Sequence, residues 1–203
     1  MPDIVVVDYG MGNLRSVQRG IKAAGSSTRL VAEEAGLTGA DAIVLPGVGA
    51  FRDAVANVAP LAPAICEAAA DGVPLLGICL GLQLLFTRST EGGSYPGLDI
   101  LPGTILPFPP GRKIPQIGWN TLSIVDAENP LVQDISEGAY VYFVHSYYAH
   151  VEKREVVVAR TRYGIDFPSI VARGTVFATQ FHPEKSGATG LRILKNFIDV
   201  VKR

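Results

Sequence analysis

The chain has 203 residues, of which 48% are hydrophobic and 18% charged, with a formal net charge of −1. This composition excludes a disordered chain, and the balanced charge offers no broad surface for nucleic acid or anionic lipid. The two cysteines, Cys66 and Cys79, are too few for a disulfide scaffold and lack metal-ligand spacing. The most apolar stretch, Val73 to Phe86, is shorter than a membrane span, and the N-terminus lacks the features of a signal peptide. We therefore expect a cytoplasmic protein that binds neither nucleic acid nor membrane.

Strands and helices are predicted to alternate through the first 86 residues. Asn13 is a suitable cap for the first helix, whose apolar residues follow helical spacing, and Gly25 ends it. The strands are continuously apolar rather than alternating, which is typical of a parallel sheet covered on both faces. The expected elements are strands Ile4–Val7, Thr28–Val31, Ala42–Leu45 and Val73–Ile78, and helices from Leu14, Phe51–Val58, Leu61–Ala70 and Leu80–Phe86.

The second half has a different pattern. Thr90 to Pro115 is rich in glycine and proline and is predicted to be a long irregular connection. The closely spaced strands that follow favour antiparallel additions to the sheet, and an amphipathic helix follows Gly190. These strands are Tyr140–Val144, Glu155–Thr161, Ile170–Arg173 and Val176–Phe181. We expect one α/β domain over residues 1–203, with three layers and a mostly parallel central sheet.

Cys79 lies in the sequence Gly77-Ile78-Cys79-Leu80-Gly81, between a predicted strand and its helix. This is the cysteine version of a nucleophile elbow, in which a tight turn exposes the central side chain and glycines give the backbone room. The helix N-terminus favours the thiolate, and the N–H of Leu80 would face an oxyanion. A buried structural cysteine is the alternative interpretation, and it is the one that we favour for Cys66.

His182 is the best candidate for the base that such a nucleophile needs. It follows a predicted strand, and Glu184 is close enough in sequence to orient its ring. Pro183 holds the pair at the end of the strand, where α/β sheets place their active sites. A capped strand end with a solvated Glu184 is the alternative.

A second oxyanion donor is expected from the turn that contains Gly47 and Val48, which also follows a strand. Its glycines allow a peptide plane to turn either way, so this turn could act as a switch. The fragment Gly10-Met11-Gly12-Asn13 lacks the third glycine of a dinucleotide-binding fingerprint. No cofactor is therefore expected, and no metal is expected because no cluster of residues has metal-ligand spacing.

With these residues identified, the sequence resembles the class I, triad-type glutamine amidotransferases. Their signature is G-x-C-x-G-x-Q followed about a hundred residues later by H-P-E; here it reads Gly77 to Gln83 and His182-Pro183-Glu184. Within this family the chain is most similar to the glutaminase subunits of imidazole glycerol-phosphate synthases. The matching stretches span nearly the whole chain: Asp8–Leu14, Leu45–Phe51, Gly77–Phe86, Pro115–Asn120, Tyr142–Tyr147 and Gln180–Lys185.

The resemblance implies that Cys79 attacks the side-chain amide of glutamine, and that His182, oriented by Glu184, protonates the departing ammonia. A thioester would form, and water activated by His182 would release glutamate. The resemblance also implies a set of residues that hold the substrate: Gln83, Glu91, His145, Ser146 and Tyr147.

The resemblance further implies a partner, a separate (β/α)₈ cyclase subunit in a heterodimer, which would receive the ammonia through a shielded path. The residues expected at that interface are Asn13, Trp119, Asn120, Tyr142 and Lys185. Binding of the cyclase subunit could flip the Gly47–Val48 peptide and complete the oxyanion hole.

Three alternatives stay open on the sequence alone. One is the glutaminase component of another synthase, such as anthranilate synthase. Another is a free-standing thiol hydrolase of related fold. The third is a flavodoxin-like binding domain in which Cys79 is buried and inert.

Overall fold

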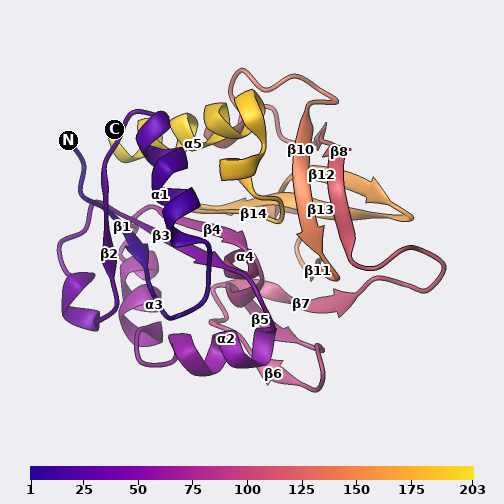
Figure 1. Ribbon diagram of the computed structural model, residues 1–203, viewed down its shortest axis with the longest axis horizontal. Helices are drawn as coiled ribbons and strands as arrows, with labels where there is room; N and C mark the ends of the chain where they lie inside the picture. Colours follow the sequence, from indigo (N-terminus) through magenta and orange to yellow (C-terminus); the bar gives the residue numbers. More distant parts are fainter.

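The computed structural model describes residues 1–203 and is built around an eight-stranded sheet (Figure 1). Five neighbouring strands are parallel, and three antiparallel strands extend one side. In spatial order they are β2 (Thr28–Val31), β1 (Ile4–Val7), β3 (Ala42–Gly47), β4 (Leu75–Cys79), β14 (Val176–Thr179), β13 (Ile165–Arg173), β12 (Val157–Tyr163) and β9 (Ser123–Ile124). The α/β class and the mostly parallel sheet are confirmed.

Helices cover both faces of the sheet. α1 (Leu14–Ala23) and α5 (Gly187–Val201) lie on one face, and α2 (Phe51–Val58) and α3 (Ala62–Ala70) lie on the other (Figure 1). Alternate residues of β1 enter the two cores: Ile4 and Val6 pack with the first pair of helices, while Val5 and Val7 pack with the second pair. Burial on both faces explains why the parallel strands are continuously apolar.

The C-terminal strands differ from the expectation in two ways. β14 pairs antiparallel with β13, as expected, but its other neighbour is β4, with which it is parallel, so β14 joins the antiparallel strands to the parallel ones. β10 (Tyr140–His145) lies outside the main sheet, in an antiparallel ribbon with β8 (Gln116–Thr121), a strand that the sequence analysis missed. The other C-terminal strands, β12 and β13, are antiparallel as expected.

A third, four-stranded sheet occupies much of the segment predicted to be irregular. It contains β11 (Tyr147–Val151), β7 (Leu101–Pro107), β5 (Phe86–Ser89) and β6 (Tyr95–Pro96). The helix expected to extend to Phe86 is therefore short: α4 spans Leu80–Leu84, and Phe86 begins β5. Phe86 is fully buried in its strand, so the core decides its conformation.

Four 3₁₀ turns complete the chain, at Glu34–Gly36, Pro130–Val132, Arg154–Val156 and Pro183–Lys185. No helix is both long enough and apolar enough to cross a membrane. The carboxyl ends of β1, β3, β4 and β14 meet at one edge of the sheet, because these strands are parallel. Open α/β sheets bind their ligands at such an edge.

Candidate active site

Cys79 occupies a strained turn between β4 and α4. Its φ of 56° and ψ of −106° lie in a region that side chains with a Cβ rarely adopt. A Cβ at Gly81 would lie 1.8 Å from the carbonyl oxygen of Leu45, and one at Gly77 would lie 3.0 Å from the Gly81 backbone. The two glycines of G-x-C-x-G therefore provide the space that this turn requires.

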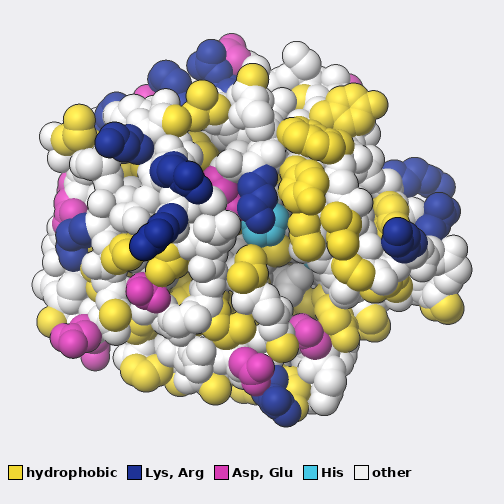
Figure 2. Space-filling model, in the orientation of Figure 1, with side chains coloured by type: hydrophobic (Ala, Val, Ile, Leu, Met, Phe, Trp, Pro, Cys, Tyr) yellow, Lys and Arg dark blue, Asp and Glu magenta, His cyan; other side chains and the backbone are white.

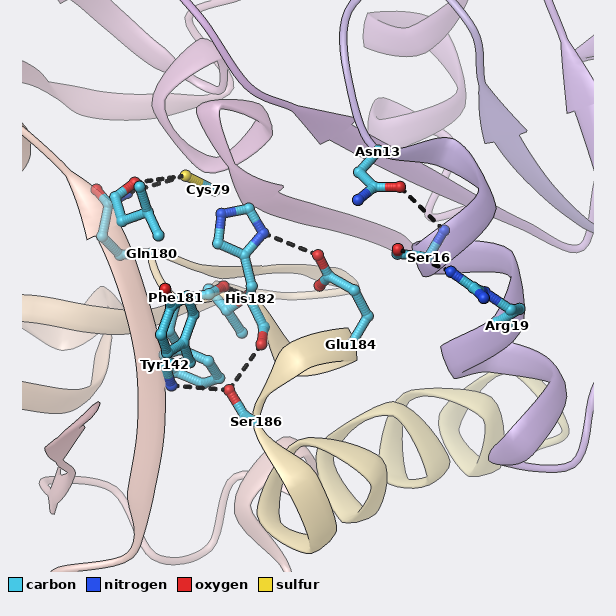
Figure 3. A network of polar contacts seen from close by, with 12 residues as sticks. Asn13, Ser16, Arg19, Cys79, Tyr142, Gln180, Phe181, His182, Glu184 and Ser186 are labelled. Carbon is cyan, nitrogen blue, oxygen red and sulfur yellow. Dashed lines mark hydrogen bonds and ion pairs between the residues drawn. The ribbon is translucent and has the colours of Figure 1, made fainter. Parts of the chain in front are cut away.

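His182 lies beside Cys79, with Glu184 on its other side (Figure 3). His182 Nδ1 is 2.8 Å from Glu184 Oε1, and both side chains are almost completely buried. Burial alone would lower the pKa of His182, but hydrogen bonds to Cys79 and Glu184, and their negative charges, outweigh it and raise the pKa to about 9. The ring is therefore held as an imidazolium at neutral pH, ready to give up a proton.

The backbone around His182 is fixed by the β10 strand. The backbone N–H of His182 donates to the Tyr142 carbonyl of β10 at 3.0 Å. Ser186 links the His182 segment to the same strand through two further hydrogen bonds. The Ser186 hydroxyl donates to the carbonyl of His182 at 2.6 Å and accepts from the N–H of Tyr142 at 2.9 Å (Figure 3).

A cavity of about 310 Å³ opens beside Cys79 and His182. Nearly all the residues expected to bind substrate or an oxyanion line it: Val48, Leu80, Gln83, Glu91, His145, Ser146 and Tyr147. The lining also includes Gly49, Pro115, Val144 and Lys185, the last of which was expected at the partner interface. The structure thus brings together residues from six separate parts of the sequence.

Gly47 lies directly beside Cys79, because the two residues pair in register on the neighbouring strands β3 and β4. A Cβ at Gly47 would lie 2.3 Å from the Tyr9 hydroxyl, so only glycine fits this position. That hydroxyl donates to the carbonyl of Pro46 at 2.7 Å and braces the turn; Tyr9 was missed by the sequence analysis. Val48, which follows, is partly exposed.

Gln83 and Glu91 face the cavity while also making contacts within the protein. Gln83 Nε2 donates to the Tyr147 carbonyl and to Gln180 Oε1, each at 3.2 Å. Glu91 Oε2 accepts from the N–H of Phe51 at 3.1 Å, which places its carboxylate at the N-terminus of α2. Glu91 is thereby held as a fixed negative group on the cavity wall.

His145 lies in an aromatic cluster beneath the cavity and cannot replace His182 as the base. Its Nδ1 is 2.8 Å from the Tyr147 carbonyl, and its Nε2 is 3.0 Å from Gln116 Oε1. Burial lowers the pKa of His145 to about 4; the hydrogen bond to Tyr147 opposes this, and the charge of His182 adds to it. His145 is therefore neutral, and it supports the segment that carries Tyr147.

Of the residues expected at a partner interface, only Lys185 lines the cavity, while Trp119, Asn120 and Tyr142 lie on the ribbon of β8 and β10, which also carries Val144 of the lining. Trp119 on β8 is 55% exposed and packs edge-on against Tyr142 of β10, with ring centroids 5.8 Å apart. Asn13 caps α1 through the N–H of Ser16, and Asn120 Nδ2 donates to the carbonyl of Arg162. Figure 2 shows hydrophobic side chains gathered over β8 and β10, beside basic side chains over α1.

The sequence analysis missed other apolar residues of this surface. Ile117 and Tyr140 are 60% and 61% exposed, on the same ribbon as Trp119. The alternation of residues in Gln116–Thr121 was the available signal, but Gly118 interrupts its strand pattern.

Comparison with known proteins agrees with this geometry. The family model described as glutamine amidotransferase class-I matches residues 5–201. A chain of the solved structure of PurLQS from Thermotoga maritima has the same fold, with a TM-score of 0.80 and 22% identity over 98% of both chains. Fold and sequence thus define a class I glutamine amidotransferase.

Curated relatives narrow the class. The chain is 52% identical to the imidazole glycerol phosphate synthase subunit HisH of Natronomonas pharaonis, over 97% of this chain and 94% of the relative. It is 48% identical to the HisH subunit of Methanosarcina mazei, over 98% of this chain and 100% of the relative. The chain belongs to the HisH family, the glutaminase subunits of imidazole glycerol phosphate synthase, which serve histidine biosynthesis.

Proposed function

We propose that Cys79, His182 and Glu184 are the catalytic triad that hydrolyses glutamine. The observation that carries this proposal is the position of His182, buried between the sulfur of Cys79 and the carboxylate of Glu184 beside a cavity. The Cys79 thiolate, paired with the His182 imidazolium, attacks the amide carbon of glutamine. The imidazolium then protonates the departing ammonia, and the ring activates the water that cleaves the thioester.

The cavity suits a glutamine side chain approaching Cys79. The N–H groups of Leu80 and of the Gly47–Val48 turn would stabilise the oxyanion, because both belong to the strand ends around Cys79. Glu91 supplies a negative charge for the α-ammonium group of the substrate. Gln83 and the backbone of residues 145–147 would hold the remaining polar atoms of the substrate.

We propose that the ammonia passes to a cyclase subunit with a (β/α)₈ barrel, in a heterodimer. Ammonia released into neutral water would be protonated and lose its nucleophilicity, so a shielded path is needed. The acceptor would be a phosphoribulosyl-formimino aminoimidazole carboxamide nucleotide, cleaved in a lyase reaction to imidazole glycerol phosphate and aminoimidazole carboxamide ribotide. The exposed ribbon that carries Trp119, beside the cavity mouth and Lys185, supports docking at this face.

A reducing compartment suits this chemistry, since Cys79 must remain a free thiol, as it is in the structure. We therefore place the enzyme in the cytoplasm. The curated relatives do not favour the glutaminase of another synthase, because those reported above carry the HisH name.

Substitution of the two cysteines separates the proposed nucleophile from the structural thiol. Cys79→Ala should abolish glutamate release measured with the cyclase subunit present, whereas Cys66→Ala should retain it. Retained hydrolysis by a folded Cys79→Ala variant would exclude Cys79 as the nucleophile.

A further inference from the structure

Gln180 is a buried residue that contacts the sulfur of Cys79 from outside the triad. Its side chain is completely buried, and its Nε2 lies 3.8 Å from Cys79 Sγ (Figure 3). Gln180 follows β14, and its backbone N–H donates to the Ser169 carbonyl at 2.9 Å, which fixes its position on the sheet. The side chain does not line the cavity, so it reaches the sulfur from the protein interior.

A chain of hydrogen bonds fixes which end of the Gln180 amide faces the sulfur. It starts at the carbonyl of Tyr147, which can only accept, and which receives Gln83 Nε2 at 3.2 Å. The Gln83 amide is thereby oriented, and the same Nε2 also donates to Gln180 Oε1 at 3.2 Å. Because the oxygen of Gln180 is turned toward Gln83, its NH₂ group must be turned toward Cys79.

Cys79 Sγ is the one hydrogen-bond acceptor in the protein for Gln180 Nε2. A neutral thiol is a weak acceptor, so it satisfies a buried amide donor poorly. A thiolate makes a charge-assisted hydrogen bond, which is about twice as strong as a neutral one. The amide therefore favours the ionised form of Cys79.

Some other groups around the Cys79 sulfur favour its thiolate form, and others favour its thiol form. The Val144 carbonyl, 3.7 Å from Sγ, accepts from the neutral thiol and so favours the protonated form. His182 faces the sulfur as a cation, while His145 beneath it is neutral. Tyr9, whose hydroxyl is bonded to Pro46, is also neutral, because burial and the charge of Cys79 raise its pKa. Gln180 and His182 therefore both favour the thiolate form of Cys79, whereas the Val144 carbonyl favours the thiol.

We propose that Gln180 is a further catalytic residue, whose amide N–H stabilises the Cys79 thiolate through an orientation imposed by Gln83 and the Tyr147 carbonyl. This inference rests on the proposed role of Cys79 as nucleophile. The proton lost by Cys79 is the one that His182 carries as an imidazolium, and the Gln180 amide neither gains nor loses a proton. Gln83 has a second role here, since it orients Gln180 in addition to facing the cavity.

The test measures how fast iodoacetamide alkylates Cys79 as a function of pH, resolved by peptide mass spectrometry. Gln180→Leu keeps the bulk of the side chain and removes the donor, and Gln180→Met serves where the leucine variant does not fold. We expect the midpoint of the Cys79 profile to rise by about one pH unit, which is about tenfold slower alkylation below the midpoint. Hydrolysis of glutamine should fall in parallel.

Two controls separate this effect from a general disturbance. Ser169 is a buried neighbour of Gln180, and its hydroxyl has no hydrogen-bond partner. Ser169→Ala should therefore leave the pH profile of Cys79 alkylation unchanged. Cys66, on α3, reports the reactivity of a second thiol in the same molecule and should not respond to Gln180.

The outcomes distinguish this inference from the proposed function. An unchanged midpoint in a folded Gln180→Leu or Gln180→Met variant would overturn the role of Gln180 and leave the triad intact. Retained glutaminase activity in Cys79→Ala would instead overturn the proposed function itself.

Discussion

His182 Nδ1 lies 2.8 Å from Glu184 Oε1, and the second carboxylate oxygen of Glu184, Oε2, is buried without a hydrogen-bond partner. Burying an ionised carboxylate is costly unless it is paired. Because His182 is the only cation bonded to this carboxylate, Glu184 acts almost entirely on the imidazole. The pair therefore links the charge of Glu184 to the protonation of His182.

Substitution of Glu184 by glutamine tests this link, since the amide keeps the shape and removes the charge. The negative charge of Glu184 helps to raise the pKa of His182 to about 9, so its loss should lower that pKa toward neutrality. We expect glutamine hydrolysis at neutral pH to fall about 100-fold or more. NMR titration of the His182 ring measures the pKa, and Glu67→Gln, an exposed change on α3, is the control. An unchanged His182 pKa in folded Glu184→Gln would contradict the link.

The backbone at Cys79 predicts a trade-off between stability and activity. Its φ of 56° disfavours any residue with a Cβ, whereas glycine adopts it freely. Cys79→Gly should therefore be more stable than Cys79→Ala by about 1 kcal/mol, although neither variant hydrolyses glutamine. Urea denaturation of the two variants gives the difference. A Cys79→Ala variant more stable than Cys79→Gly would show that the backbone at this turn is not strained.

Trp119 is expected to anchor the cyclase subunit. Its half-exposed aromatic side chain lies on the ribbon whose Val144 lines the cavity, and exposed aromatic residues are enriched among those that dominate binding energy. Trp119→Ala should weaken binding to the cyclase subunit about 30-fold, as measured by calorimetry. Val125 is equally exposed, at 55%, but follows the edge strand β9 of the main sheet rather than lying on the ribbon of β8 and β10, so Val125→Ala is the matched control. Equal affinities for the two variants would place the interface elsewhere.

The turn at Gly47 and Val48 predicts that the glutaminase depends on its partner. If docking turns this peptide so that its N–H faces the cavity, the oxyanion hole is completed only in the complex. One oxyanion donor contributes about 100-fold to the rate, so glutamate release should rise by about that factor when the cyclase subunit and its nucleotide are added. Equal rates with and without them would argue against this switch.

The sequence predicted the strand ends around Cys79 and His182 because the residue types at these ends are restricted and leave a recognisable pattern in the sequence. Continuous apolar runs form the parallel strands, and Gly77 and Gly81 are required by contacts with their own turn and with β3. β7 escaped prediction because Pro102, Gly103 and Pro107 break its alternation, although burial of Leu101 and Ile105 stabilises it. Non-local pairing outweighed local propensity there.

Gln180 could not be found as a site residue from its sequence context. It matched the family within Gln180–Lys185, but nothing local shows where its amide points. Its orientation depends on Gln83 and Tyr147, which lie 97 and 33 residues away in the chain (180 − 83 and 180 − 147). Only the folded chain brings these three groups together.

The central claim is that Cys79 carries the glutamyl group during turnover. Acid quenching during glutamine hydrolysis, in the presence of the cyclase subunit, followed by peptide mass spectrometry, detects that intermediate directly. We predict that the peptide containing Cys79 gains the mass of one γ-glutamyl group, while the peptide containing Cys66 does not. Active turnover with the glutamyl group on another residue would contradict the account.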